Sequence, residues 1–401
     1  MSARLRLTVV THYFAEHGGG IERVAGRLCE DLTTRHGHTV RWFASHTDSL
    51  TSDSESPVER IASVVERVAV PNWNGIERST GLPYPLWSVA GLRALARAIE
   101  QSDAVHVHDF SYFGSLAAAR IARSRGVPLL LTQHTGAVRT GSRAFATLYG
   151  VGERTIGRWL FATAAAVTCV SETTRAHWRP IVRDATKLQT VWNGLDFDDT
   201  IRVDDRERGR WRAAWGVRDD RPIVLFVGRR IRKKGIEIVH GVARAMPQVT
   251  FLIAGQGPID PEVWALPNVR TLGYVASERV GELYELADVL LLPSYAEGFP
   301  LVVQEALVRG TAVLSTAEVA AACPPVAESI AHCPIPERDD AQPWIRTLER
   351  LLTGSIGEPD RTRRAERARG LWSRTRCAAE YDAILRRIAV QRPDGGTAKF
   401  A

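Results

Sequence analysis

Short apolar runs alternate with amphipathic helical stretches along most of the chain. In the first half, the apolar runs that predict strands cover residues 5–10, 39–44, 103–108, 127–132, 165–170 and 188–191. In the second half, they cover residues 223–227, 251–254, 289–293 and 311–315. Helical periodicity appears between the runs, as in residues 88–100, 277–286 and 301–309. Because strands and helices alternate, the pattern predicts an α/β fold with parallel sheets.

The length of the chain predicts two domains, because 401 residues exceed what one ordinary hydrophobic core holds. Residues 196–221 are dense in charge and poor in apolar side chains, apart from Trp211 and Trp215. We place the boundary at the start of this stretch, which gives domains over residues 1–198 and 199–370. The last residues, 391–401, are polar and glycine-rich, and we expect them to be disordered.

The composition is that of a globular protein, with 45% hydrophobic and 24% charged residues. No apolar run approaches the ~20 residues that a membrane-spanning helix needs. The N-terminus enters a strand-like pattern directly and lacks the features of a secretory signal, so we expect a cytoplasmic protein. The five cysteines include no C-x-x-C pair, which predicts scattered buried thiols rather than disulfides or a zinc site.

The net charge is +7, and the chain has only four lysines, which leaves 48 arginines among its 52 basic residues. A GC-rich bacterial genome is the simplest explanation of this bias. The arginines are spread through both halves, whereas a nucleic-acid binder concentrates its charge on one element, so we expect no nucleic-acid partner.

Residues 139–183 hold an excess of arginine around a helix expected at 149–161. This region is either a solvated face or a surface for an anionic acceptor or membrane headgroups, the latter implying peripheral contact with the inner face of a membrane.

Two segments of the first half are rich in glycine. The turn Gly18-Gly19-Gly20 precedes a helix, an arrangement that lets backbone amides approach an anion closely, although a lone triple glycine is more often a flexible loop. It does not form the G-x-G-x-x-G motif of dinucleotide-binding proteins. The segment 72–87, NWNGIERSTGLPYPLW, also contains prolines and aromatic residues. It either lines an acceptor site or forms a packed surface loop.

The segment 288–315 combines a buried strand, a small polar loop, a helix that Gly310 ends, and a second strand. Glu297 in the loop and Glu305 on the helix are eight residues apart, which places their backbones ~12 Å apart at ~1.5 Å per helical residue. The catalytic carboxyl groups of a glycosidase are roughly 5 to 10 Å apart. The wider spacing suits the two ends of an extended ligand such as a sugar nucleotide. Amides of Gly298 and Phe299 between them are placed to meet a diphosphate.

A second loop of the C-terminal half carries cations. Residues 228–235 read GRRIRKKG between a strand and a helix that begins at Ile236. Arg229 and Lys234 are five residues apart, and two cations placed in this way can hold a diphosphate and stabilise it as it leaves. A basic loop alone is more often simply solvated.

Three histidines follow or end predicted strands. His106 and His108 point to the same face of one strand, but no third ligand stands at a metal-binding spacing, so we expect no metal. His134 lies at the tip of the next strand, just before Gly136. In that place a histidine either binds a ligand at the carboxyl end of the sheet or serves a structural role.

Taken together, EGFPLVVQEAL after an apolar strand and the preceding Gly-Arg…Lys-Gly loop resemble family 4 of the retaining glycosyltransferases. The resemblance runs through nearly the whole chain. It implies the GT-B fold, in which two Rossmann-like domains face each other across a cleft, and a final helix, here 371–390, that crosses back to the first domain. The residues that match the family's donor site are Gly18, Gly19, Gly20, His134, Arg229, Lys234, Tyr274, Val275, Glu297, Gly298, Phe299, Pro300, Leu301 and Glu305.

The resemblance also implies a reaction. A glycosyl group would pass from a nucleoside-diphosphate sugar to an acceptor hydroxyl, with retention of configuration, and without a metal or other cofactor. Glu297, His134, Arg229 and Lys234 would form the catalytic set, and Glu305 would bind the ribose. There are two alternatives: a sugar-nucleotide epimerase of the same fold, and a sugar-nucleotide-binding or membrane-peripheral protein without catalysis. The segment 316–325 lacks the glycines usual in the family, and Arg230, Arg232 and Lys233 replace its usual loop residues.

Overall fold

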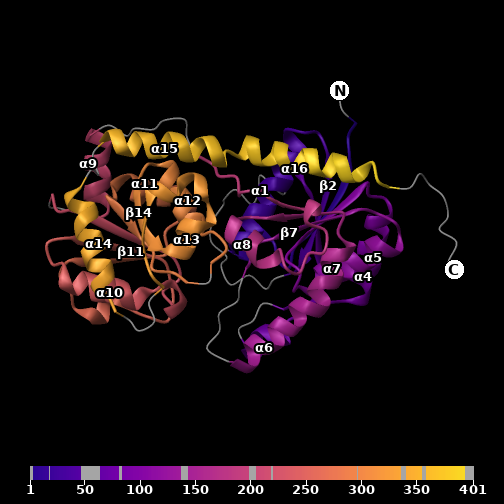
Figure 1. Cartoon of the computed structure of the whole chain (residues 1–401), viewed down its shortest axis with the longest axis horizontal. Helices are drawn as coiled ribbons and strands as arrows, with labels where there is room; N and C mark the ends of the chain where they lie inside the picture. The colour runs from indigo at the N-terminus through magenta and orange to yellow at the C-terminus, as the bar shows by residue number, and fades with distance from the viewer. Residues whose placement is uncertain are drawn as a thin grey trace. The chain divides into compact units, whose positions relative to one another are not determined.

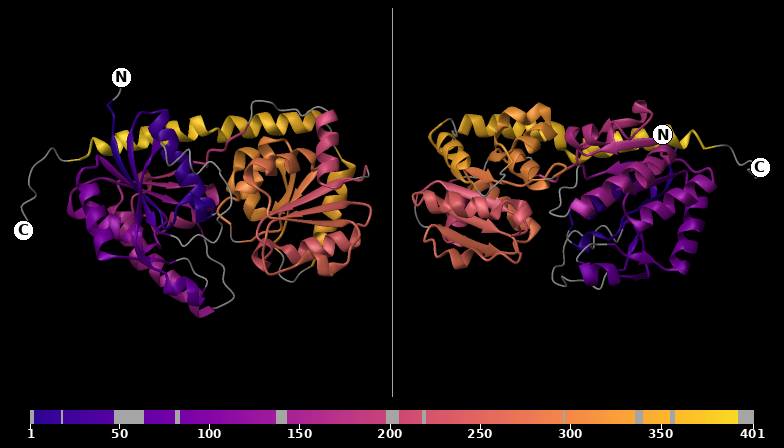
Figure 2. Two further views of the ribbon diagram at one scale, coloured as in Figure 1. Left: turned by 180° about the vertical axis from the view of Figure 1, so that it is seen from behind. Right: turned by 60° about the horizontal axis from the view of Figure 1, so that its bottom comes forward.

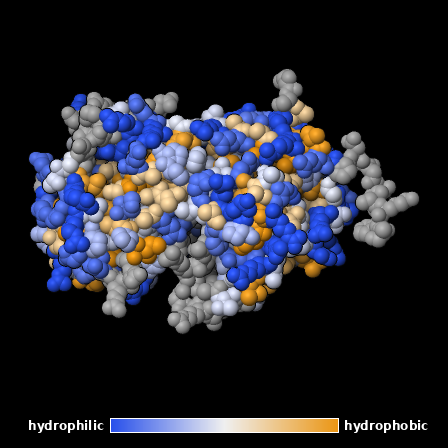
Figure 3. All heavy atoms as spheres, in the orientation of Figure 1, coloured by the Kyte–Doolittle hydropathy of each residue, from blue (hydrophilic) through white to orange (hydrophobic). Residues whose placement is uncertain are grey.

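The computed structural model describes residues 3–17, 19–46, 64–80, 84–136, 143–197, 205–217, 220–295, 297–335, 340–354 and 358–392. The chain forms two compact units (Figure 1). Unit 1 contains residues 1–194 and 374–401, and unit 2 contains residues 195–373. Among the described residues, no helix has the length and apolar character needed to cross a bilayer. The face shown in Figure 3 mixes hydrophilic and hydrophobic residues over both units.

Unit 1 is built on a parallel sheet of seven strands in the order β3-β2-β1-β6-β7-β8-β9. The strands are β1 (Arg6–Val10), β2 (Thr39–Ser45), β3 (Glu66–Val70), β6 (Ala104–His108), β7 (Leu129–Gln133), β8 (Ala166–Cys169) and β9 (Leu188–Thr190). The apolar runs of the sequence predict all of these except β3. Strand β3 was missed because its pattern, ERVAV, buries only its last residue fully.

Helices cover both faces of this sheet (Figure 2). One core joins the sheet to α1 (Gly20–Thr34) and α16 (Arg374–Ala389). The other joins it to α4 (Val89–Glu100), α5 (Phe113–Ser124), α7 (Arg158–Thr163) and α8 (Glu172–Trp178). The cores are nearly continuous layers of Leu, Val, Ala and aromatic side chains, as strands buried on both faces require.

Unit 2 repeats the architecture with six parallel strands in the order β12-β11-β10-β13-β14-β15. They are β10 (Ile223–Val227), β11 (Thr250–Ala254), β12 (Val269–Gly273), β13 (Val289–Leu291), β14 (Ala312–Thr316) and β15 (Ile330–Cys333). The main helices are α9 (Asp205–Ala214), α10 (Ile236–Ala245), α11 (Ser277–Leu286), α12 (Leu301–Val308), α13 (Ala317–Ala322), α14 (Gln342–Thr353) and α15 (Glu358–Trp372). Gly310, expected to end α12, follows it with φ 75°, a left-handed conformation that glycine adopts without strain.

The region expected to be one helix over 149–161 is divided into α6 (Arg143–Gly152), a π-helical turn η2 (Glu153–Gly157) and α7. A π turn takes one more residue per hydrogen-bonded ring than an α turn, and it therefore rotates the residues that follow. Ile156 was expected beside Trp159 and Leu160, but it is 47% exposed while Leu160 is buried. That expectation was wrong, because it assumed an uninterrupted α-helical period.

The final helix also differs from expectation. Trp372 ends α15 inside unit 2, where its ring packs 5.5 Å from that of Phe299. Ser373 interrupts the helix and forms a bridge with Leu195, and α16 then begins at Arg374. The residues after Arg392 lie outside the described ones. All five cysteines are buried and free, which confirms the expectation of scattered thiols.

Arg374 attaches α16 to α1 within unit 1. Its Nη2 donates to Glu30 Oε2 and its Nε to Asp31 Oδ2, both at 2.7 Å. The two carboxylates are nearly buried, and this guanidinium contributes to the compensation of both charges. On its outer side, Asp31 Oδ1 also accepts from Arg35 Nε at 2.8 Å.

We expect Arg374→Met to lower the free energy of unfolding by about 3 kcal/mol, because it removes the guanidinium that bonds to both nearly buried carboxylates. Arg35→Met is the matched control, since Arg35 contacts the same Asp31 but is half exposed, and its removal should cost less than about 1 kcal/mol. Urea denaturation of both variants measures the difference. Equal losses would contradict the role assigned to Arg374.

Candidate functional site

In doubly wound parallel sheets, ligands bind beyond the carboxyl ends of the strands where the strand order reverses. In unit 2 this point lies between β10 and β13, which pair in parallel with Val224 opposite Val289. The segments that leave these two strands are residues 228–235 and 292–300. They contain six of the predicted site residues, and the fold therefore brings these together at one edge of the sheet.

Glycines allow the loops at this edge to touch through their backbones. Gly235 has φ 72°, and a Cβ there would lie 2.4 Å from the carbonyl oxygen of Pro293. Gly255, after β11, has φ 125°, and a Cβ there would lie 2.0 Å from the carbonyl oxygen of Gly228. Since a Cβ would not fit at either position, the two glycines allow the loop after β10 to approach both neighbouring loops closely.

The closest contact between the two segments is an ion pair. Lys234 Nζ lies 2.7 Å from Glu297 Oε1, and Ser294 Oγ donates to the same oxygen at 2.6 Å. The backbone amide of Tyr295 donates to the carbonyl of Lys233 at 3.2 Å, which fixes the same two segments a second time. Lys234 and Glu297, predicted from separate motifs, thus form one unit.

The charge of Glu297 is stabilised despite burial. Burial raises the pKa of this carboxyl, but Lys234, Lys233 and the hydrogen bond from Ser294 together outweigh it and hold the pKa below its ordinary value. Glu297 is therefore an anion at neutral pH. It can orient hydroxyl groups and stabilise a nearby positive charge.

Arg229 differs from Lys234. Its side chain is exposed, and no described residue forms a hydrogen bond or ion pair with its guanidinium. Of the other loop cations, Arg230 pairs with Asp260 at 3.5 Å and Arg232 with Glu237 at 3.5 Å. Arg229 and the exposed Lys233 are therefore the cations of this loop that pair with no described carboxylate.

Helix α12 carries the second predicted glutamate. It begins after Pro300, so the amides of its first turn point toward the same edge of the sheet. Glu305 is partly buried, and its Oε2 accepts from Tyr284 Oη at 2.9 Å. Phe299 is buried and packs on Trp372, which supports the entry into the helix.

The residues expected at the base-binding position follow the edge strand β12. Tyr274 is 62% exposed and Val275 is partly buried. The carbonyl of Gly273, just before them, accepts from the amide of Gly255 at 2.6 Å. The backbone is thus tied to the loop after β11, and the Tyr274 side chain contributes little to the core.

In unit 1, the predicted glycine turn adjoins a buried ion pair. His12 Nε2 lies 2.9 Å from Glu22 Oε1, and both side chains are nearly inaccessible. Gly20 opens α1, and a Cβ on Gly19 would lie 2.1 Å from Glu22 Oε2, so a larger residue there would displace the Glu22 carboxylate from this position. Gly18 lies outside the described residues.

His134 is held by two neighbours at the carboxyl end of β7. Its backbone amide donates to Asp109 Oδ1 at 2.8 Å, and its Nε2 lies 2.9 Å from His108 Nδ1. Burial lowers the pKa of His134 to about 4 and that of His108 well below its ordinary value. Both rings are therefore neutral at pH 7, and one N–H bridges them, which fixes the ring of His134.

The pair His106 and His108 does not form a metal centre with other described residues, among which no group of three His, Cys, Asp or Glu side chains converges. His106 Nε2 instead contacts Thr132 Oγ1 at 2.7 Å, and Thr132 in turn contacts Thr168 at 2.7 Å. Burial lowers the pKa of His106 to about 3.

Sequence reasoning missed several residues that position the site. They are His12, Glu22, Asp109, Tyr284 and Ser294. A polar residue directly after an apolar strand was a usable signal for His12, Asp109 and Ser294. No pattern indicated Tyr284, because its hydroxyl reaches Glu305 across 21 residues of chain.

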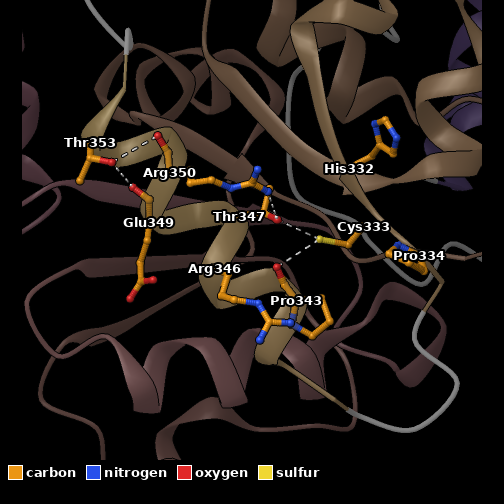
Figure 4. Close-up of a pocket in the computed structure, with 9 residues that line it drawn as sticks. All are labelled: His332, Cys333, Pro334, Pro343, Arg346, Thr347, Glu349, Arg350 and Thr353. Carbon is orange, nitrogen blue, oxygen red and sulfur yellow. Dashed lines mark hydrogen bonds between the residues drawn. The ribbon is translucent and has the colours of Figure 1, made fainter.

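A further pocket of about 560 Å³ opens in unit 2 between α14 and the end of β15 (Figure 4). Arg346 and Arg350 project from α14 toward it, and Arg350 Nη2 donates to Thr347 Oγ1 at 3.1 Å. None of the predicted site residues lines it. It is therefore distinct from the edge of the sheet at Lys234 and Glu297.

Each of the two units is built on a parallel sheet between helices, which makes this an α/β protein with two Rossmann-like units. Two family models cover most of the chain, Glycosyltransferase Family 4 over residues 18–199 and Glycosyl transferases group 1 over residues 207–370. The chain belongs to family 4 of the glycosyltransferases.

Curated relatives carry the name D-inositol 3-phosphate glycosyltransferase. The protein of Mycobacterium avium is 28% identical over 394 residues, which cover 89% of this chain and 88% of that protein. The protein of Mycobacteroides abscessus is 29% identical over 296 residues, which cover 67% of this chain and 65% of that protein. The chain thus spans slightly less than two thirds of the latter.

Solved structures show the same fold at low identity. Anabaena HepE in complex with UDP superposes with a TM-score of 0.72 and 14% identity over 95% of this chain and 99% of that chain. Sucrose-phosphate synthase from Thermosynechococcus elongatus gives a TM-score of 0.70 and 20% identity over 96% of this chain and 100% of that chain. The fold is GT-B, as expected.

We expect Asp109→Asn to stabilise the protein at neutral pH. Burial raises the pKa of Asp109 to about 6, so the ionised carboxylate costs stability above that pH and the cost disappears as pH falls toward the unfolded pKa of about 4. Asparagine keeps an oxygen for the His134 amide and tolerates the φ of 57°. The gain at pH 8, about 1 to 3 kcal/mol, should shrink between pH 6.5 and pH 4 in urea denaturation.

Asp109→Ala is the control for that comparison. It removes the same charge but leaves the His134 amide without its acceptor, so it should be less stable than Asp109→Asn at every pH. A gain for Asp109→Asn that does not change with pH would contradict the pKa shift.

Proposed function

We propose that this protein transfers a glycosyl group from a nucleoside-diphosphate sugar to an acceptor hydroxyl, with retention of configuration and without a metal ion. The observation that carries the proposal is the Lys234–Glu297 pair at the strand reversal of unit 2, with Arg229 on the same loop. It joins a cation for a leaving phosphate and an anion for the sugar within 2.7 Å. The structural neighbour HepE is described in complexes with UDP and with UDP-glucose, which supports a nucleotide-sugar donor.

The leaving diphosphate accumulates negative charge as the glycosidic bond breaks. Arg229, Lys234 and the amides that open α12 are placed to stabilise that charge, a task that a divalent ion performs in other enzymes. Since Glu297 already compensates Lys234, the charge of Arg229, which pairs with no described carboxylate, adds to the net attraction for the donor.

The remaining predicted residues have roles along the donor. Glu297 orients the sugar and offsets positive charge that develops on its ring. Glu305, held at one oxygen by Tyr284, accepts from the ribose hydroxyls with the other. His134, neutral and fixed by His108 and Asp109, positions the sugar through hydrogen bonds. Gly19 and Gly20 let the backbone approach the donor.

Two alternatives predict different use of the donor. A sugar-nucleotide epimerase consumes the donor without any acceptor. A binding protein holds the donor but turns nothing over. The charged residues of the proposed site are complete, which favours catalysis.

We expect Arg229→Met to raise the donor KM about tenfold to hundredfold, because it removes charge-assisted hydrogen bonds to phosphate. Its thermal midpoint should stay within about 1 °C of the parent, since Arg229 is exposed and unpaired with described residues. Lys234→Met should weaken the donor and also lower the midpoint, because Glu297 loses its partner. An unchanged donor KM in Arg229→Met would remove Arg229 from the site.

Glu305→Ala should raise the donor KM about tenfold, because two ribose hydroxyls lose a charged acceptor. Tyr284→Phe is the matched control. It removes only the hydroxyl that holds Glu305 and should change the donor KM less than threefold, roughly 0.6 kcal/mol. Initial rates over a donor concentration series measure both. If Glu305→Ala left donor KM and turnover unchanged, the ribose assignment would be wrong.

A further inference from the structure

The segment between β3 and α4 of unit 1 carries an exposed tryptophan beyond the carboxyl edge of the sheet. It forms strand β4 (Asn72–Trp73), helix α3 (Gly75–Thr80) and strand β5 (Leu86–Trp87). Trp73 is 62% exposed, whereas the tryptophans at 42, 87, 178, 344 and 372 are buried. An indole that the core does not use is available to a ligand.

The position of Trp73 is fixed by its surroundings. Strands β4 and β5 pair antiparallel with Trp73 opposite Leu86, and the amide of Ser88 donates to the carbonyl of Pro71 at 2.8 Å. The indole lies over Gly75, where a Cβ would come within 2.1 Å of the ring. Glycine at this position therefore lets the ring rest on the backbone while most of its surface stays open.

A carboxylate lies next to this ring in the chain and is held by two polar neighbours. Asn74 Nδ2 donates to Glu77 Oε2 at 2.7 Å. Tyr13 Oη donates to the same carboxylate oxygen and lies 3.1 Å from Asn74 Oδ1. These contacts engage only Oε2, and no described residue bonds to Glu77 Oε1.

The same cluster adjoins the glycine turn. The ring of Tyr13 stacks on that of His17, with centroids 4.1 Å apart, and His17 lies directly before the glycines. The residue before Tyr13 is His12, which pairs with Glu22 on α1. The free carboxylate oxygen of Glu77 thus lies beside the segment that the proposed function assigns to the donor, and the exposed indole lies four residues earlier in the chain.

We propose that Trp73, Asn74 and Glu77 form the acceptor subsite and select an uncharged carbohydrate ring; this inference rests on the proposed function. The C–H face of a pyranose or cyclitol packs on the indole, and Glu77 Oε1 accepts from its hydroxyl groups. A phosphorylated acceptor is disfavoured, because its charge meets Glu77. Of the arginines near this segment in the chain, Arg67 pairs with Glu16 and Arg78 also has a partner, so their charges are already engaged.

Acceptor kinetics of the full chain test this inference. The probes are methyl glycosides of glucose, galactose and mannose and myo-inositol, each compared with a phosphorylated counterpart. We expect at least one neutral probe to accelerate nucleotide release, and its phosphorylated counterpart to act at least about tenfold less well.

The variants separate the parts of the subsite. Trp73→Ala should raise the acceptor KM about tenfold, whereas Trp73→Phe, which keeps an aromatic face, should stay within about threefold of the parent. Glu77→Gln, which keeps an oxygen for Tyr13 but loses the charge, should narrow the preference for neutral over phosphorylated probes. Val390→Ala, an exposed apolar truncation elsewhere in unit 1, is the matched control and should change nothing.

Three results would overturn the subsite: turnover with phosphorylated probes only, no response to any neutral probe, or equal effects of Trp73→Ala and Trp73→Phe. Failure of the proposed function is measured separately, in reactions without acceptor. There the protein would neither bind nor hydrolyse any nucleotide sugar. In that case saturation-transfer NMR with the methyl glycosides still decides about the subsite. A signal that Trp73→Ala abolishes supports it, and the absence of a signal in the parent chain contradicts it.

Discussion

The contact between Lys234 and Glu297 depends on two segments of backbone that meet without side chains between them. Gly235 lies against Pro293, and Gly255 lies against Gly228, at distances that exclude a Cβ. The parallel order of β10 and β13 brings the segments to the same edge, and the glycines let them close. Without this approach, the cation and the carboxylate would face solvent separately. The donor assignments of unit 2 therefore follow from a packing constraint as much as from charge.

At the carboxyl edges of their sheets, unit 2 keeps a side chain ionised, whereas unit 1 keeps two histidine side chains neutral. In unit 2, Lys234 keeps Glu297 ionised in a partly buried place, which suits stabilisation of charge. In unit 1, burial keeps His134 and His108 neutral, and Asp109 fixes the backbone beside them. A neutral ring with a fixed orientation suits hydrogen bonding to hydroxyl groups. This division agrees with phosphate recognition in one unit and hydroxyl recognition in the other.

Much of the fold could be predicted from the sequence, because buried parallel strands are short apolar runs and helices between them keep an α-helical period. The edge strand β3 was not predicted because it is only partly buried. The π turn at Glu153–Gly157 changes which residues face the core after it, and a regular α-helical period could not predict this change. The division at Ser373 was hidden in a continuous helical pattern. Of the site, Lys234 and Glu297 could be predicted singly, but their contact arises from tertiary structure. The roles assigned to the site residues stay predictions.

The most direct test of the donor site is binding and turnover of UDP-, GDP-, ADP- and dTDP-sugars by the full chain, with and without EDTA. Thermal shift measures binding, and NMR of the products measures hydrolysis, transfer and anomeric configuration. We predict that one nucleotide sugar stabilises the protein and is consumed in the presence of EDTA, faster when an acceptor is added, with the configuration of the donor retained. No stabilisation by any member, or strict dependence on a metal, would contradict the site built on Arg229, Lys234 and Glu297.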